Sequence, residues 1–178
     1  MARSFHWAAA LLVLISTTPL PAAGRAASVP HIRSIHKDLL DAVAEASRVS
    51  PTFRQLTERL AASDVIVYLH RRLSTEPGLA GATAFMAAAG GVRYLRISIE
   101  PRLSGCERLA LLGHELQHAV EIADAPSVVD QESLEALYRA KGFRAPAACA
   151  RCFDSADAIA AGRQIQKEVL GQGAAATR

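Results

Sequence analysis

Two histidines with a glutamate between them, His114, Glu115 and His118, stand in a stretch whose apolar residues recur every three or four positions. That spacing predicts a helix over about residues 106–123. On such a helix the two imidazoles project about 40° apart and about 6 Å apart along the axis, so both can reach one metal ion. Glu115 lies on the flank of the same face, where a carboxylate can accept a proton from water held by the ion. The segment therefore predicts a metal site with a general base beside it.

The same three residues could instead stand on a solvated helix face without binding a metal. The apolar stripe of this helix lies opposite the histidines, and it consists of Leu109, Leu112, Leu116 and Val120. Burial of that stripe leaves the histidine face free to line a cleft. No charged residue stands at 116, 117 or 119 to compete for the site. We therefore prefer the metal site to the solvated face.

The segment Leu112 to Val120, LGHELQHAV, resembles the active helix of the zincin metallopeptidases. The predicted order of strand, hairpin, active helix and later helix resembles that of small gluzincin-type domains. The resemblance implies Zn²⁺ on His114 and His118, with Glu115 as the general base of peptide hydrolysis. It also implies a sheet-edge strand that binds substrate in extended form, which would be residues 92–99 or a neighbouring strand.

The third zinc ligand is left open by the motif itself. The metzincin branch is excluded because Asp124 stands six positions after His118, where that branch has a histidine. Glu121 shares the histidine face, but it lies about 7 Å beyond the midpoint of the pair along the axis. A glutamate Cα can stand only about 5.5 Å from zinc. We interpret Glu121 as a partner that orients a histidine, or as a charge at the rim.

Asp154 is the third ligand that we choose. Gluzincins, by the resemblance, take this ligand from a later helix that packs on the active one, usually as a glutamate. Asp154 stands at the start of the last predicted helix, where it could equally cap that helix together with Ser155. Asp157 and Glu135 remain alternatives.

The remaining elements follow from apolar periodicity. Helical spacing predicts helices over about residues 33–47, 51–62, 131–141 and 155–170, in addition to the active helix. Short β-branched runs predict strands at 65–69, 81–88 and 92–99, and the last two are joined by a Gly90-Gly91 turn that needs positive φ. The expected fold is α+β: a small three-stranded sheet with N-terminal helices, the active helix and two following helices. Tyr138 stands at core spacing and is interpreted as packing.

Length and composition bound the possible classes of protein. The chain has 178 residues and a formal charge of +3, with 51% hydrophobic and 21% charged residues. We expect one folded domain over residues 28–171, followed by a flexible tail at 172–178. The basic residues are scattered rather than gathered into a stripe, which argues against nucleic acid as a partner.

The N-terminal 27 residues predict an export signal peptide. Arg3 precedes the apolar run Ala8 to Ile15, and a stretch of small residues with two prolines follows. The run is far shorter than the roughly 20 residues that span a membrane, and no later segment approaches that length. We expect a periplasmic or secreted protein without stable membrane insertion.

Three cysteines bear on the same site. Cys149 and Cys152 form a C-x-x-C pair just before Asp154, and Cys106 opens the active helix. Oxidation is the default outside the cytoplasm. A bridge from Cys106 to Cys149 or Cys152 would tie the start of the active helix to the segment that carries Asp154.

The sequence thus predicts an exported zinc-dependent hydrolase, a metallopeptidase that acts on a peptide or protein. Zinc lowers the pKa of bound water towards 7, and Glu115 would accept the proton. The alternative is a non-catalytic, zinc-stabilised exported binding protein. An open coordination position, detectable with a hydroxamate, distinguishes the two.

Overall fold

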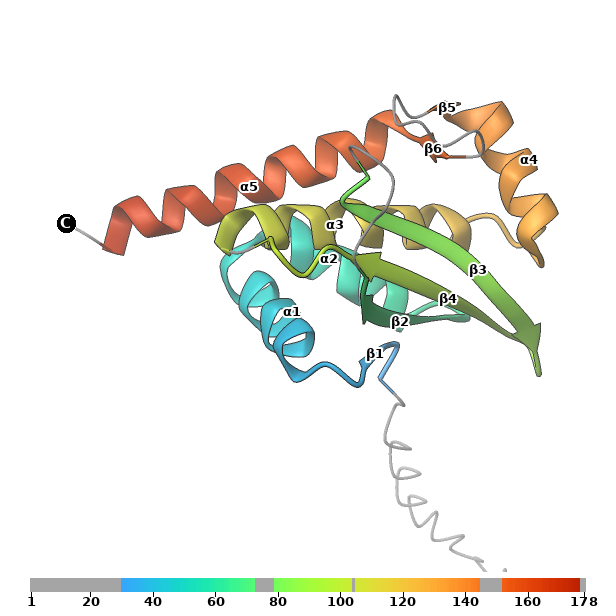
Figure 1. Ribbon diagram of the computed structural model, residues 1–178, viewed down its shortest axis with the longest axis horizontal. Helices are drawn as coiled ribbons and strands as arrows, with labels where there is room; N and C mark the ends of the chain where they lie inside the picture. The colour runs from blue at the N-terminus through green and yellow to red at the C-terminus, as the bar shows by residue number, and fades with distance from the viewer. Residues whose placement is uncertain (1–29, 73–78, 104, 145–151, 177–178) are drawn as a thin grey trace, which may run out of the picture.

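The computed structural model describes residues 30–72, 79–103, 105–144 and 152–176 (Figure 1). The elements are β1 (Ile32–Ser34), α1 (Lys37–Val49), α2 (Pro51–Ala61), β2 (Val65–Arg71), β3 (Gly81–Ala89), β4 (Val92–Ile99), α3 (Gly105–Ala123), α4 (Gln131–Lys141), β5 (Phe143–Arg144), β6 (Phe153–Asp154) and α5 (Ala156–Ala176). The expected α+β class is confirmed. The predicted signal peptide lies outside the described residues. None of the described helices is long and apolar enough to cross a membrane.

The main sheet has four strands in the order β1-β2-β4-β3. β2 pairs in parallel with both β1 and β4, and β3 pairs with β4 in antiparallel register. Gly90 and Gly91 join β3 to β4 with φ angles of 59° and 75°, as the hairpin turn requires. β3 therefore lies at one edge of the sheet and β1 at the other.

The prediction of three strands was wrong: residues 32–34 form β1 instead of opening a helix, and β5 and β6 form a second, two-stranded sheet. β1 satisfies backbone groups along the outer side of β2, and the Ser34 hydroxyl donates to Leu69 O at 2.8 Å. Helical spacing of Ile32 and Ile35 suggested the earlier helix start, but Ile35 is exposed. α1 begins only at Lys37.

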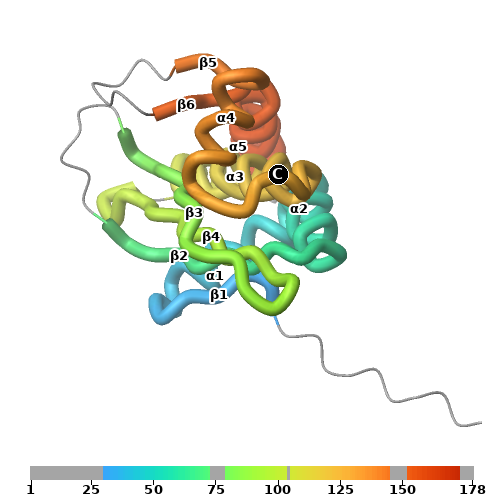
Figure 2. The backbone as a smooth tube through the Cα atoms, turned by 90° about the vertical axis from the view of Figure 1, so that its right-hand side faces the viewer, coloured from blue at the N-terminus to red at the C-terminus, as the bar shows by residue number. Residues whose placement is uncertain are grey.

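α3, the helix that carries the histidines, lies at the centre of the molecule. It contacts α1, α2 and α5 as well as three strands of the sheet, and Figure 2 shows α2, α3 and α5 on one side of β2, β3 and β4. The predicted apolar stripe is confirmed as core: Leu109, Leu112, Leu116 and Val120 are all buried. Burial of this stripe fixes which face of α3 remains for the histidines.

α3 and α5 pack closely because glycines stand at their contact. A Cβ at Gly113 would come within 2.0 Å of Ile165 Cδ1, and one at Gly162 would lie 3.3 Å from His114 Cβ. α5 continues to Ala176, beyond the predicted end at residue 170, so helix replaces the first part of the predicted flexible tail. The close approach brings the start of α5, and the strand before it, over the histidines.

Arg93 of β4 fastens the C-terminal end of α3 to the sheet. Its guanidinium is almost fully buried, binds the Asp64 carboxylate at 2.7 and 2.8 Å, and donates to Ile122 O at 2.7 Å and Ala123 O at 3.0 Å. These carbonyls belong to the last turn of the helix, which has no intrahelical donors for them. The sheet and the helix that carries the site are thereby held in one register.

α4 and the small sheet of β5 and β6 lie together at one end of α5 (Figure 1). The Ser155 hydroxyl accepts from Ala158 N–H at 3.1 Å, so Ser155 is the residue that caps α5. Asp154 immediately precedes this cap, on β6. Its side chain accepts only from Ser155 N–H locally, at 2.7 Å, and it is left to face α3.

Candidate metal centre

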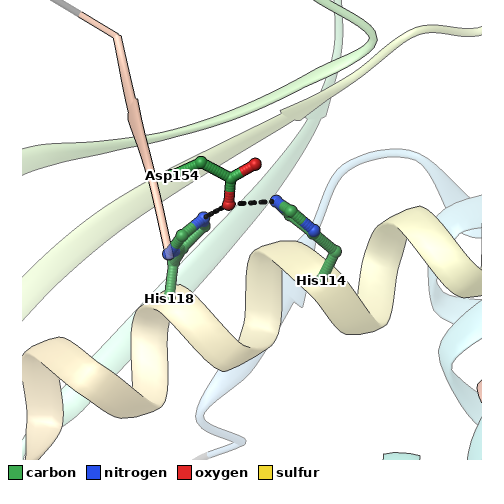
Figure 3. A group of neighbouring side chains, drawn as sticks. All are labelled: His114, His118 and Asp154. Carbon is green, nitrogen blue, oxygen red and sulfur yellow. Dashed lines mark ion pairs between the residues drawn. The ribbon is translucent and has the colours of Figure 1, made fainter. Parts of the chain in front are cut away.

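His114, His118 and Asp154 come together in one group (Figure 3). Asp154 Oδ1 lies 3.4 Å from His114 Nε2 and 3.5 Å from His118 Nε2. One potential ligand atom from each residue lies within 4.8 Å of the other two. The two histidines come from adjacent turns of α3, and the Asp154 carboxylate faces them from β6.

The two distances from Asp154 fit the coordination sphere of zinc. Zinc binds imidazole nitrogen and carboxylate oxygen at about 2.0–2.2 Å in a tetrahedral arrangement, which places neighbouring ligand atoms roughly 3.4 Å apart. The two measured separations from Asp154 Oδ1 match this edge. Two neutral imidazoles and one carboxylate are also a donor set that zinc accepts. The ligand atoms of all three residues lie within 4.8 Å of one another, so the group is a candidate zinc site in which the two histidine rings would close on the ion.

Two buried residues behind His118 fix its ring and its tautomer. His118 Nδ1 lies 2.9 Å from Tyr138 Oη and 3.1 Å from Glu121 Oε2, and the Tyr138 hydroxyl donates to the same carboxylate at 2.8 Å. The hydroxyl proton is used on Glu121, and an ionised carboxylate only accepts. Nδ1 must therefore carry a proton, which leaves Nε2 as the ligand atom.

Glu121 is itself enclosed by donors. It is 2% exposed, and its Oε1 accepts from the Ser155 hydroxyl at 2.7 Å and lies 3.4 Å from Lys141 Nζ. Burial alone would raise the pKa of Glu121, but hydrogen bonds from His118, Ser155 and Tyr138 lower it to about 2. The structure places Glu121 where a partner that orients a histidine must lie, and not at the rim.

The acidic neighbours also act on the histidine. Burial disfavours the charged form of His118, yet the hydrogen bonds to Asp154 and Glu121 and the charge of Glu115 outweigh it and raise its pKa to about 9. The pKa of Asp154 is lowered: burial opposes the shift, and His118 and His114 cause it. The protonated imidazole of His118 is therefore favoured, with Nδ1 facing Glu121 and Nε2 facing Asp154 at the position where a cation would bind.

His118 and Glu121 are expected to contribute most to the free energy of unfolding of the metal-free protein between pH 4.5 and 6.5. The folded pKa of His118 lies above its ordinary 6.5, so its contribution is complete below pH 6.5 and is lost as pH rises through about 9. The folded pKa of Glu121 lies below its ordinary 4.5, so its contribution is complete above pH 4.5 and is lost as pH falls towards about 2. Urea titrations of EDTA-treated protein across this range measure both limbs.

The control for this pH dependence is Glu121→Gln, which removes the charge but keeps the shape. Its acid limb should disappear and its alkaline limb should shrink, because His118 loses one of the carboxylates that retain its proton. A wild-type stability that stays level from pH 6.5 to 9 would contradict the assignment.

Glu115 lines the same cleft as the three residues of the group. The cleft has a volume of about 330 Å³ and lies between β3 on one side and α4 and β6 on the other. Glu115 is only 3% exposed, and the Thr83 hydroxyl donates to its Oε2 at 2.8 Å. The carboxylate that the motif singled out therefore faces the space beside the histidines and does not extend into solvent.

The other acidic candidates are not brought to the histidines. Asp157 is largely exposed and lies 3.6 Å from Lys141 Nζ. Glu135 lines the cleft, where it lies 3.3 Å from Arg139, but it is not part of the group of ligand atoms. Among the alternatives raised by the sequence, only Asp154 lies within ligand distance of both histidines.

The edge strand at the cleft is β3. β4, residues 92–99, pairs with a strand on each side, so it offers no free backbone groups to a substrate. Among the described strands β3 pairs with β4 alone, and its first residues, Gly81 to Thr83, line the cleft beside Glu115. The neighbouring strand, rather than 92–99 itself, has the position that the resemblance implied.

The proposed bridge from Cys106 was wrong. Cys106 is a free cysteine, and Cys152 is disulfide-bonded. Asp154 lies over His114, which is about 12 Å further along α3 than Cys106, whereas a disulfide needs Cα atoms within about 7 Å. The remaining cysteine, Cys149, lies outside the described residues.

The sequence did not reveal the residues that support the site. Tyr138 is buried, as predicted, but its hydroxyl joins His118 to Glu121. Its position at a core spacing was a usable signal, because a buried tyrosine hydroxyl normally has a polar partner. Thr83 and Ser155 gave no signal, since nothing in their local sequence indicates which carboxylate they will meet.

The chain was compared with protein-family models, curated proteins and solved structures, and no match was found.

Proposed function

We propose that this chain is an exported zinc-dependent hydrolase that cleaves peptide bonds. One observation carries the proposal: the Asp154 carboxylate lies 3.4 and 3.5 Å from two helix-borne imidazoles, the three ligand atoms are within 4.8 Å of one another, and the cleft that they line also contains Glu115. Three described ligands, instead of the four of a structural site, support a catalytic role, because the fourth position would remain for water or substrate.

In this proposal each residue has a distinct task. His114, His118 and Asp154 would hold the ion, which when bound supplies Lewis acidity to the carbonyl under attack. Glu115 would accept a proton from the attacking water and pass it to the leaving amine. Tyr138 and Glu121 would keep His118 Nε2 directed at the ion by holding Nδ1.

The lining of the cleft supports a peptide as substrate. One wall is the start of β3, whose outer edge can pair with an extended backbone. The opposite wall contributes apolar side chains from α4 and β6, including Leu134 and Phe153. An extended backbone with apolar side chains, as in an unfolded protein, matches both walls.

Zinc analysis and a hydrolysis assay together test the proposal. Purified protein is expected to contain one zinc ion per chain and to cleave fluorescein-labelled casein. EDTA should abolish cleavage and ZnCl₂ should restore it. Acetohydroxamate should bind the zinc form and not the metal-free form.

Two outcomes would reject the proposal in different ways. Zinc that binds tightly without any affinity for acetohydroxamate would indicate a closed site, and hence the non-catalytic zinc-stabilised alternative. Protein that contains no transition metal, and takes up none at neutral pH, would exclude both.

A further inference from the structure

The Glu115 side chain is held by β3, the strand that forms one wall of the cleft beside α3. Gly81 and Thr83 stand two positions apart on this strand, so they lie on the same face of it. Each meets a different oxygen of the carboxylate. The Thr83 hydroxyl donates to Oε2 at 2.8 Å, and the same hydroxyl lies 3.4 Å from the backbone oxygen of Glu115.

Gly81 meets the other oxygen by having no side chain. A Cβ at this position would lie 2.5 Å from Glu115 Oε1 and 2.9 Å from Leu111 Cδ1. The φ angle of Gly81 is not positive, so an alanine here would be free of backbone strain. Space for the carboxylate is therefore what the glycine provides.

The two contacts restrain the carboxylate at both of its oxygens. Thr83 holds one oxygen by a hydrogen bond, and the missing side chain at Gly81 leaves room for the second oxygen where it lies. A general base must lie within hydrogen-bond reach of the proton that it accepts. A displacement of about 1 Å in such a group can lower a rate by about a hundredfold.

We propose that Thr83 and Gly81 are positioning residues for Glu115, which set the direction of its carboxylate without touching zinc. This inference rests on the proposed function for its catalytic consequence, but the placement of the carboxylate is a property of the protein alone. The competing view is that both residues merely pack β3 against α3. Positioning requires the hydroxyl of Thr83, whereas packing would be served equally by a methyl group of the same size.

The experiment compares Thr83→Val, Thr83→Ser and Gly81→Ala with wild type. Thr83→Val keeps the volume and removes the hydroxyl, whereas Thr83→Ser keeps the hydroxyl. Gly81→Ala meets only the ends of flexible side chains, so Glu115 should move while the fold persists. Thr57→Val and Gly171→Ala are matched controls: the Thr57 hydroxyl donates to Arg54 O, and a Cβ at Gly171 meets nothing within 4 Å.

Crystal structures of the metal-free variants give the first measurement. The Glu115 carboxylate should be displaced in Thr83→Val and Gly81→Ala, and it should retain its wild-type position in Thr83→Ser and both controls. The zinc dissociation constant should change less than about threefold in every variant, because Thr83 bonds to Glu115 and a Cβ at Gly81 meets Glu115 and Leu111, none of which is a proposed ligand. An undisplaced carboxylate in Thr83→Val and Gly81→Ala would overturn the proposal.

Hydrolysis of labelled casein gives the second measurement. Thr83→Val and Gly81→Ala should lower kcat by about ten- to a hundredfold with little change in KM, and Thr83→Ser should stay close to wild type. Equal losses in Thr83→Val and Thr83→Ser, or a loss that appears only in KM, would favour packing and overturn the proposal. A wild-type protein without hydrolytic activity would refute the proposed function, and the crystal structures would still decide whether these residues place Glu115.

Discussion

Glu115→Gln is expected to lower kcat for casein hydrolysis by at least about a hundredfold and to leave zinc bound. The amide has the size of the carboxylate and can still accept from Thr83, so the wall of the cleft should persist. It cannot accept the proton of the attacking water, which is the step assigned to this residue. Steady-state kinetics together with zinc analysis of the same preparation measure both parts.

Glu107→Gln is the matched control for this substitution. Glu107 lies in the first turn of the same helix and is exposed, so its variant should retain wild-type kcat and zinc content. If Glu115→Gln cleaves casein at the wild-type rate, Glu115 is not the general base. If it loses zinc, the substitution has disturbed the ligands, and the assignment of separate roles to Glu115 and the histidines fails.

Asp154→Asn is expected to weaken zinc binding by at least about a hundredfold. Among the residues that the structure describes, the substitution removes the one carboxylate within ligand distance of both histidines, yet an amide oxygen remains to accept from Ser155 N–H. The loss should exceed that of Glu121→Gln, because substitution of a residue that only orients a ligand typically costs about 10–100-fold. Competition with a chromophoric zinc chelator measures both dissociation constants.

Asp157→Asn separates a ligand effect from a general loss of charge. Asp157 lies three positions after Asp154, is largely exposed and pairs with Lys141, so its variant should bind zinc as wild type does. Equal affinity in Asp154→Asn and wild type would exclude Asp154 as the third ligand. Equal losses of zinc affinity in the two aspartate variants would mean that Asp154 acts through its charge alone and not as a ligand.

Fold prediction from the sequence succeeded where the signal was local. The apolar periods of α2, α3 and α4 gave their bounds to within about two residues, and Gly90 and Gly91 adopt the positive φ that the hairpin needs. Prediction failed at β1, where residues that the spacing of Ile32 and Ile35 assigned to a helix pair with β2 instead. A segment of that length has too little periodicity of its own, and its conformation is decided by the strand that it meets.

Prediction of the site likewise succeeded for residues that are close in sequence and left open those that are distant. His114, Glu115 and His118 belong to one stretch of helix, so their spacing places them on neighbouring turns before any tertiary contact forms. Asp154 belongs to a different element, and from the sequence it could equally have been the cap of α5. Ser155 takes the cap in the structure, and Asp154 faces the histidines.

The sequence by itself determined that two imidazoles and a carboxylate share one helix and that an apolar stripe lies on the face opposite the histidines. Only the tertiary structure decided which residues complete that arrangement: Asp154 above the histidines, Glu121 and Tyr138 behind His118, and Gly81 and Thr83 against Glu115. The physical reason is the sequence distance over which the two kinds of interaction act. Helical spacing is fixed by backbone geometry over a few residues, whereas these partners meet only when the glycines between α3 and α5 and the edge of the sheet bring distant segments together.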